Sequence, residues 1–219
     1  MQLSLARCWA AMAASVLLAL LGGCGLVTST AMQPDLELRC DVLIAGGSTA
    51  ALSAALTATI AAKHLHVCLT EPTDELGGQL AYNPAIDYGT APSQPSVEWA
   101  SMTGNVTSEH SPCWVSKSCY APATLGKWVA GRLAALPNLH VLLRTTVRAA
   151  TRDATSGKVL SLTLVTRTPT VPADEWSLRL SDALPDWYSP EASAAFLKTV
   201  RTINASVIIE ATELGDVLA

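Results

Sequence analysis

Residues 41–52 read Asp41-Val-Leu-Ile-Ala-Gly-Gly-Ser-Thr-Ala-Ala-Leu52, an apolar run that passes through paired glycines into small side chains. The run at 41–45 predicts a short strand buried on both faces of a parallel sheet, and residues 50–63 predict a helix. A second apolar strand, 65–70, ends immediately before Glu71. This order predicts a βαβ dinucleotide-binding unit, in which the N-terminus of the helix faces a pyrophosphate and an acidic side chain binds a ribose.

The glycine turn matches the dinucleotide-binding pattern G-x-G-x-x-G in part. Gly46 occupies the first position, where a tight turn needs a residue without Cβ, and Gly47 adds another glycine inside the turn. The second and third positions hold Ser48 and Ala51. The Ser48 side chain narrows the approach of backbone to phosphate, yet its hydroxyl can donate a hydrogen bond to the same phosphate. A plain strand-to-helix turn would have similar residues, so both interpretations stay open on this turn alone.

Three downstream segments favour a bound dinucleotide. Glu71 lies 25 residues after Gly46, near the spacing of about 20 residues expected for a ribose ligand. Its carboxylate can accept hydrogen bonds from the 2′- and 3′-hydroxyls, although a solvated charge at a strand end is the alternative. Gly77-Gly78-Gln79 lets backbone pass close to a bulky ligand, although a flexible surface loop is the alternative. Residues 210–216 can present backbone amides and a carboxylate to a pyrophosphate or a ribityl chain.

Beyond this unit, predicted helices and strands continue to alternate. We expect helices at 122–135 and 189–200, strands at 139–148, 159–167 and 205–211, and irregular connections at 72–120 and 168–188. Turn residues between the strands at 139–148 and 159–167 favour a β-hairpin or meander. The predicted fold class is α/β: a Rossmann-like, three-layer domain with a parallel sheet and an inserted β-meander.

Several longer motifs resemble one branch of the FAD-dependent oxidoreductases in the glutathione-reductase-like superfamily. They are the glycine turn at 46–51, Glu-Pro-Thr-Asp-x-x-Gly-Gly-Gln at 71–79, Cys-Trp-Val-Ser at 113–116, Asp-Trp-Tyr-Ser-Pro-Glu at 186–191 and Ala-Thr-Glu-x-Gly-Asp at 211–216. The resemblance covers roughly residues 41–219 and implies an FAD-binding domain. Members of that branch continue past the Gly-Asp motif, so the resemblance also implies an N-terminal fragment whose FAD-binding domain is incomplete at its C-terminus.

The resemblance assigns cofactor-binding roles residue by residue. The FAD pyrophosphate would lie against Gly46, Gly47, Ser48 and Ala51, and the adenosine ribose against Glu71. The ribityl chain and flavin would lie near Gly77, Gly78 and Gln79, the adenine would contact the backbone of Val147, and a second cofactor contact would come from Thr212, Gly215 and Asp216. Ser48 in place of the second glycine is a departure from the pattern.

The resemblance implies hydride transfer from a small-molecule substrate to FAD. The substrate is unidentified, and the company of relatives suggests a carbohydrate-derived molecule. An NAD-binding dehydrogenase and a truncated, non-catalytic binding module or pseudoenzyme are the alternatives. The sequence identifies no catalytic residue. A net charge of −4 without a basic run argues against nucleic acid as a partner.

The first 24 residues have the features of a secretory signal peptide. Arg7 is the only charge before an apolar run from Trp9 to Leu21, and small residues precede Cys24. Leu21-Gly-Gly-Cys24 resembles the lipobox of bacterial lipoproteins, so Cys24 is a candidate lipid anchor and the only expected link to a membrane. Residues 25–40 would form a tether to the domain at 41–219, and the protein would be exported to the periplasm or the extracellular space.

The remaining cysteines fit an exported protein without a metal centre. Cys113 and Cys119 can pair as a disulfide in a loop-rich region, whereas Cys68 lies in a predicted buried strand and is expected to be a small apolar core residue. Their spacing fits no zinc pattern, and no histidine pair accompanies them.

Overall fold

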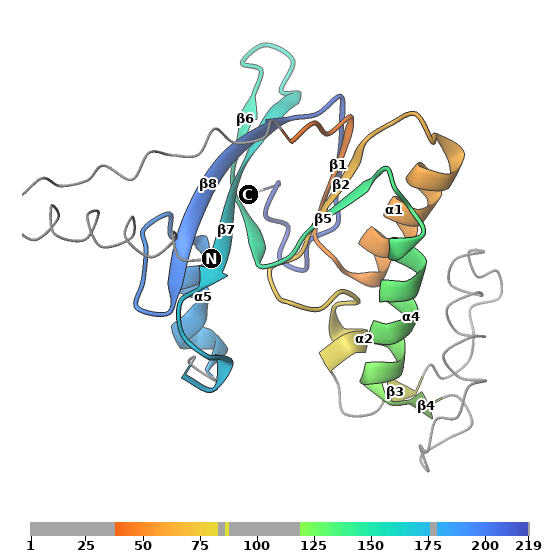
Figure 1. Ribbon diagram of the computed structural model, residues 1–219. Coiled ribbons are helices and arrows are strands. Elements are labelled where there is room, and N and C mark those ends of the chain that lie inside the picture. Colours follow the sequence, from red (N-terminus) through yellow and green to blue (C-terminus); the bar gives the residue numbers. More distant parts are fainter. Residues whose placement is uncertain (1–37, 83–85, 88–118, 176–178, 219) are drawn as a thin grey trace, which may run out of the picture. The chain divides into compact units, whose positions relative to one another are not determined.

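The core of the protein is a four-stranded parallel sheet (Figure 1). The computed structural model describes residues 38–218 apart from 83–85, 88–118 and 176–178. The sheet has the strand order β5-β2-β1-β9, formed by β1 (Val42–Ala45), β2 (Val67–Thr70), β5 (Leu139–Leu142) and β9 (Val207–Glu210). Every residue of β1 and β2 is buried, as expected for central strands covered on both faces.

Two long helices cover one face of this sheet. They are α1 (Thr49–Ala61) and α4 (Pro122–Ala134), and the short α2 (Gln79–Tyr82) lies beside α4. Ile44 and Leu69 of the sheet pack against Leu52 of α1 and Leu125 of α4 in one apolar cluster. A two-stranded ladder of β3 (Ile86–Asp87) and β4 (Cys119–Tyr120) precedes α4.

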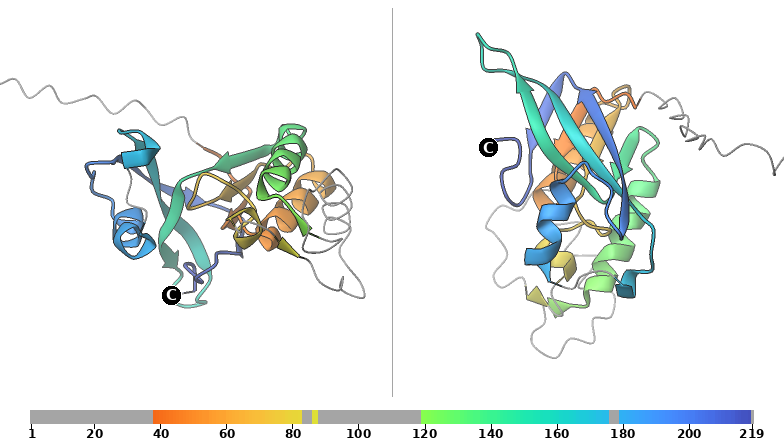
Figure 2. Two further views of the ribbon diagram at one scale, coloured as in Figure 1. Left: turned by 90° about the horizontal axis from the view of Figure 1, so that it is seen from below. Right: turned by 90° about the vertical axis from the view of Figure 1, so that its left-hand side faces the viewer.

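An antiparallel meander covers the opposite face (Figure 2). Its strands are β6 (Thr145–Arg152), β7 (Val159–Pro169) and β8 (Phe196–Asn204), in that spatial order. Leu162 and Leu164 of β7 pack against Leu43 of the parallel sheet in a second apolar cluster. Helices, parallel sheet and meander therefore form three layers, and the predicted α/β fold class with an inserted meander is confirmed.

The βαβ unit and most other predicted elements are confirmed with boundary shifts of a few residues, but the single strand predicted at 139–148 is wrong. Leu143 and Arg144 divide it into β5, which belongs to the parallel sheet, and β6, which begins the meander. Arg144 adopts a left-handed backbone conformation with φ of 51°, and its N–H donates to the Thr73 carbonyl at 2.7 Å. This turn carries the chain from one sheet to the other.

The helix predicted at 189–200 is also wrong. Residues 196–204 form β8, which pairs with β7 along its whole length, and a helix α5 (Leu180–Tyr188) lies where a loop was expected. A serine followed by proline is typical of a helix start, but Ser189-Pro190 follows the last residue of α5, where proline is also common because it cannot continue a helix. A 3₁₀ turn at Ala173–Glu175 precedes α5.

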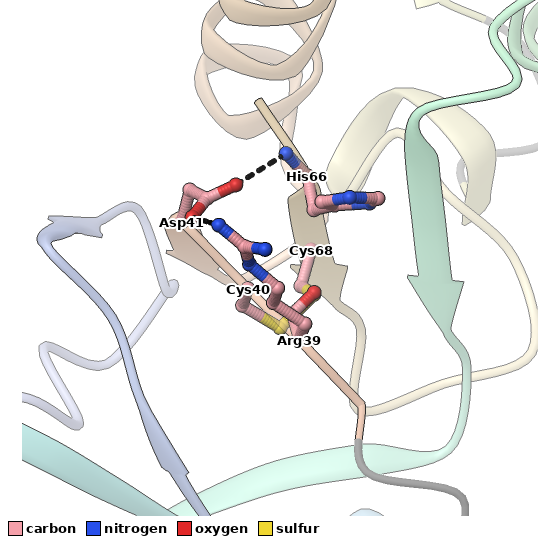
Figure 3. The surroundings of a disulfide bond; sticks show 5 residues. All are labelled: Arg39, Cys40, Asp41, His66 and Cys68. Atoms are coloured by element: carbon pink, nitrogen blue, oxygen red, sulfur yellow. Dashed lines mark hydrogen bonds and ion pairs between the residues drawn. A yellow bond between two sulfur atoms is a disulfide. The ribbon is translucent and has the colours of Figure 1, made fainter. Parts of the chain in front are cut away.

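A disulfide joins Cys40, just before β1, to Cys68 in β2 (Figure 3). The expectation that Cys68 is a free core residue is therefore wrong, although its side chain is fully buried. Beside the disulfide, Asp41 accepts a hydrogen bond from the His66 N–H at 2.8 Å and pairs with Arg39 at 3.1 Å.

The expected pairing of Cys113 with Cys119 cannot be compared with the structure, because Cys113 lies outside the described residues. Among the described helices, none is both long and apolar enough to span a membrane.

Candidate functional site

A cavity of about 510 Å³ opens at the carboxyl ends of β1, β2 and β9. Ligands of open α/β sheets bind at this edge, because the turns that follow the strands present backbone and side chains there. The turn after β1 contributes Gly46 and Gly47, and the turn after β2 contributes residues 71–73. The cavity is completed by Gly78, Gln79, Leu184, Trp187, Tyr188, Thr212, Glu213, Leu214 and Asp216.

Both glycines after β1 are required by close packing. Gly46 has φ of +104°, and a Cβ there would lie 2.3 Å from the carbonyl oxygen of Ala211. A Cβ on Gly47 would lie 2.3 Å from Oε2 of Glu71 and 2.6 Å from Cδ2 of Leu76. The turn thus brings the backbone before α1 directly against the end of β9 and the side chain of Glu71.

Ser48 caps the helix that follows. Its Oγ accepts a hydrogen bond from the Ala51 N–H at 3.4 Å and donates one to the Ala211 carbonyl at 3.1 Å. A serine at the N-cap satisfies one of the free N–H groups of the first helical turn. Ser48 therefore has a structural reason to replace the second glycine of the pattern, and its hydroxyl hydrogen is donated to Ala211, the residue after β9, rather than to a phosphate.

Glu71 is a buried carboxylate, 5% exposed, at the end of β2. Its Oε1 accepts hydrogen bonds from the N–H and the hydroxyl of Thr73, both at 2.7 Å. Burial raises the pKa of Glu71 above its usual value, and the carboxylate of Glu213 adds to this rise, while the two hydrogen bonds from Thr73 oppose it. The site thus holds an oriented acceptor whose charge is lost sooner on acidification than that of an exposed glutamate.

The glycine pair at 77–78 crosses over the turn after β1. The Gly77 N–H donates to the Gly47 carbonyl at 2.8 Å. Gly78 has φ of +56°, and a Cβ there would lie 2.5 Å from Oε1 of Glu213 and 3.3 Å from the Cα of Ser48. These glycines therefore pack three segments together at the rim of the cavity, and Gln79 begins α2 beside them.

The loop after β9 is organised by two side chains. The hydroxyl of Thr212 accepts from the N–H groups of Gly215 and Asp216, both at 2.9 Å. Glu210 accepts from the N–H groups of Thr212 and Val217, both at 2.6 Å. These four bonds fold residues 212–217 into a compact turn at the cavity wall.

Asp216 also contacts α5. Its Oδ2 accepts a hydrogen bond from the Tyr188 hydroxyl at 2.8 Å. Burial raises the pKa of Asp216, and Glu210 raises it further, while the bond from Tyr188 lowers it. Burial and the bond to Asp216 raise the pKa of Tyr188, so the phenol stays protonated and continues to donate.

The structure brings most of the predicted cofactor-binding residues together. Seven line the cavity: Gly46, Gly47, Glu71, Gly78, Gln79, Thr212 and Asp216. Ser48, Ala51, Gly77 and Gly215 lie in the same turns or in the first turn of α1. Val147 does not line the cavity: its side chain is 2% exposed and packs in the apolar cluster between the two sheets, and the predicted contact of its backbone with adenine stays a prediction.

Sequence reasoning missed the wall that α5 contributes, formed by Leu184, Trp187 and Tyr188. The sequence predicts an irregular connection over 168–188, whereas residues 180–188 form α5 with Pro185 inside the helix. The Asp-Trp-Tyr-Ser-Pro-Glu motif at 186–191 was the one sequence signal that pointed to this segment.

Comparison with known proteins yields distant similarities only. No protein-family model and no curated protein matches the chain. THI4 from Thermovibrio ammonificans is 15% identical, with a TM-score of 0.48 over 83% of this chain and 60% of that one. The 3-ketosteroid-Δ4-(5α)-dehydrogenase from Rhodococcus jostii RHA1 is 12% identical, with a TM-score of 0.45 over 84% and 47% of the two chains. PqsL, a probable FAD-dependent monooxygenase from Pseudomonas aeruginosa, is 12% identical, with a TM-score of 0.37 over 78% and 41%. The chain spans less than two thirds of the length of each of these proteins.

Proposed function

We propose that the cavity binds FAD and that the protein is an FAD-dependent oxidoreductase. The observation that carries this proposal is the buried carboxylate of Glu71, held by Thr73 and facing the glycine turn that begins α1. A helix N-terminus beside an oriented acidic side chain suits the pyrophosphate and ribose of a dinucleotide. The residue types of the Gly77–Gln79 and Thr212–Asp216 segments favour FAD over NAD.

The residues at the cavity fit each part of such a cofactor. The N–H groups of the first turn of α1 would face the pyrophosphate, since the first turn of any helix has N–H groups without helical partners. Glu71 would accept hydrogen bonds from the adenosine ribose. The turn at 212–216 and the rim at 78–79 would bound the rest of the molecule. When bound, FAD would accept a hydride from a C–H bond of the substrate. The protein would orient the cofactor and the substrate and exclude water.

Replacement of Glu71 tests this assignment. We expect Glu71→Gln to weaken FAD binding roughly 10- to 100-fold, because a charge-assisted hydrogen bond contributes about 1.5–3 kcal/mol. Flavin fluorescence measured during titration of the purified protein with FAD reports the affinity. Glu75→Gln is the matched control, since Glu75 lies in the same segment but is exposed, and its affinity should equal that of the wild type.

Two outcomes would contradict the proposal. Equal FAD affinity in Glu71→Gln and the wild type would show that this carboxylate does not bind the cofactor. A wild-type protein that binds no FAD but binds NAD would instead favour the dehydrogenase alternative, and one that binds neither would favour a binding module without a cofactor.

We also propose a small-molecule substrate, with carbohydrate-derived molecules as the first candidates, and export with a lipid anchor at Cys24. The Cys40–Cys68 disulfide supports export, because disulfides persist mainly in oxidising compartments. In fractionated cells we expect the full chain in the membrane fraction and a Cys24→Ala variant in a soluble exported or precursor form. An unchanged distribution of the variant would rule out the anchor, and a cytosolic wild-type protein would rule out export.

A further inference from the structure

Arg167 is a buried cation between the meander and α5. It lies on β7 and is 4% exposed, with its guanidinium carbon 4.2 Å from the ring centroid of Trp187 and 5.3 Å from that of Phe196. One guanidinium nitrogen, Nη2, donates to the carbonyl of Pro72. Within the part of the chain that the structure describes, its Nε has no hydrogen-bond partner.

Stability alone is a poor reason for this arrangement. Taking a charge out of water costs free energy, and a well-packed apolar side chain of similar volume is often as stable or more so at such a position. Burial lowers the pKa of Arg167 to about 10, although the nearby carboxylate of Asp186 opposes this change. The side chain remains charged at neutral pH, so the molecule keeps a desolvated cation next to the turn that follows β2.

Two routes connect Arg167 to Glu71. In the first, its side chain binds the carbonyl of Pro72, the residue between Glu71 and Thr73. In the second, the backbone N–H of Arg167 donates to the Arg144 carbonyl at 2.9 Å, and the backbone N–H of Arg144 donates to the Thr73 carbonyl at 2.7 Å. Thr73 in turn makes both hydrogen bonds to Oε1 of Glu71. The first route transmits the position of the cation to the turn that holds the carboxylate. The second route is made by backbone groups and remains when the side chain of residue 167 is changed.

We propose that Arg167 is a positioning residue that fixes the turn at 71–73, so that the Glu71 carboxylate faces the cofactor cavity. This inference rests on the proposed function, because it assigns Arg167 a role in the ribose site. The guanidinium suits this role because it lies over the rings of Trp187 and Phe196 while its Nη2 donates to the turn. A lysine ammonium is a compact point charge without the planar, forked set of donors that does both at once. Trp187 also lines the cofactor cavity, so the ring that holds Arg167 is part of the cofactor wall.

The charges around Glu71 make the proposal measurable. From the loop after β9, Glu213 raises the pKa of Glu71, and from β7 Arg167 lowers it, while Thr73 on the turn itself lowers it through hydrogen bonds. Arg144 and Asp74 form an ion pair at 3.7 Å beside the same turn. Removing the cation of Arg167 takes away one lowering influence and loosens another. The pKa of Glu71 should therefore rise further, and the carboxylate should lose its charge at a higher pH.

The experiment compares Arg167→Met, Arg167→Lys and Lys198→Met in the full chain. Lys198 is the matched control, a fully buried cation on β8 that pairs with Asp186 of α5 at 3.1 Å and donates to the Ser189 carbonyl at 3.3 Å, so it binds α5 and its end rather than the turn. Two measurements are made: the carboxyl titration of Glu71 in FAD-free protein by carbon NMR, assigned with Glu71→Gln, and FAD affinity as a function of pH.

For Arg167→Met we expect a higher pKa of Glu71 and roughly tenfold weaker FAD binding at neutral pH. As the pH is lowered, this variant should lose its affinity for FAD at a higher pH than the wild type does. Arg167→Lys should restore the titration in part but not the affinity. Lys198→Met should melt at a lower temperature with both measurements unchanged. An unaltered Glu71 titration in a folded Arg167→Met protein would overturn the inference, as would equal shifts in Lys198→Met. If Arg167→Met does not fold, the Glu71 titration in Arg167→Lys takes its place, and a titration equal to that of the wild type would then overturn the inference. Since the titration needs no FAD, a wild-type protein that fails to bind FAD would defeat the proposed function separately.

Discussion

Gly46→Ala is expected to cost roughly 3–5 kcal/mol of folding free energy and to abolish FAD binding. The added Cβ would meet the Ala211 carbonyl oxygen at 2.3 Å and the Thr212 nitrogen at 2.7 Å, and both are backbone atoms that cannot rotate away. A φ of +104° is also strained for any residue with a Cβ. Because domains of this size are stable by only about 5–15 kcal/mol, the loss is a large fraction of the total. Urea denaturation and flavin uptake measure the two effects.

Gly131→Ala is the matched control for this substitution. Gly131 lies in α4, and among the described residues a Cβ built there meets no atom within 4 Å apart from its own helix backbone. The same chemical change should therefore stabilise the protein by about 0.5–1 kcal/mol, because alanine favours a helix interior more than glycine does. A Gly46→Ala protein as stable as the wild type would mean that the glycine turn does not lie against Ala211 and Thr212. It would therefore contradict the arrangement of backbone that forms the cavity wall.

The part of the site that could be predicted from sequence is the part built from neighbouring elements. Gly46 and Glu71 lie at the ends of two strands joined by one helix, and a short parallel strand followed by a helix has a recognisable pattern. The contacts that make Gly47 and Gly78 indispensable could not be predicted in this way. They join segments far apart in sequence, such as Gly78 with Glu213, and no local pattern reports such a distance.

The errors in the fold have similar physical reasons. A proline after a serine is compatible with the start of a helix and with the end of one, so Ser189-Pro190 did not distinguish α5 from a following helix. Pairing with β7, a long-range interaction, determined that residues 196–204 form a strand. The left-handed backbone at Arg144, a non-glycine residue, likewise has no local signature. No local pattern marks Arg167 either, because its contacts are with Pro72, far away in sequence, and with Trp187 of α5, a helix in a segment where the sequence predicts a loop.

Removal of the Cys40–Cys68 disulfide is the second large effect that we expect. The two cysteines are 28 residues apart, and opening a loop of this length should destabilise the protein by about 3.5 kcal/mol in the chain-entropy account. Replacing both residues by alanine avoids a free thiol at the fully buried Cys68 position. Urea denaturation of the double variant, and of the wild type with and without dithiothreitol, measures the loss. The reduced wild type should resemble the double variant.

The same variant separates stability from cofactor binding. The disulfide lies at the amino end of the sheet, whereas Gly46 and Glu71 follow the carboxyl ends of β1 and β2. The ladder between these strands pairs Val42 with Val67 and Ile44 with Leu69, so their register does not depend on the covalent bond. Wherever the variant remains folded, its FAD affinity should therefore equal that of the wild type. A folded variant with weakened FAD binding would show that the disulfide also positions the site, and a wild type whose stability is unaffected by dithiothreitol would argue against the disulfide itself.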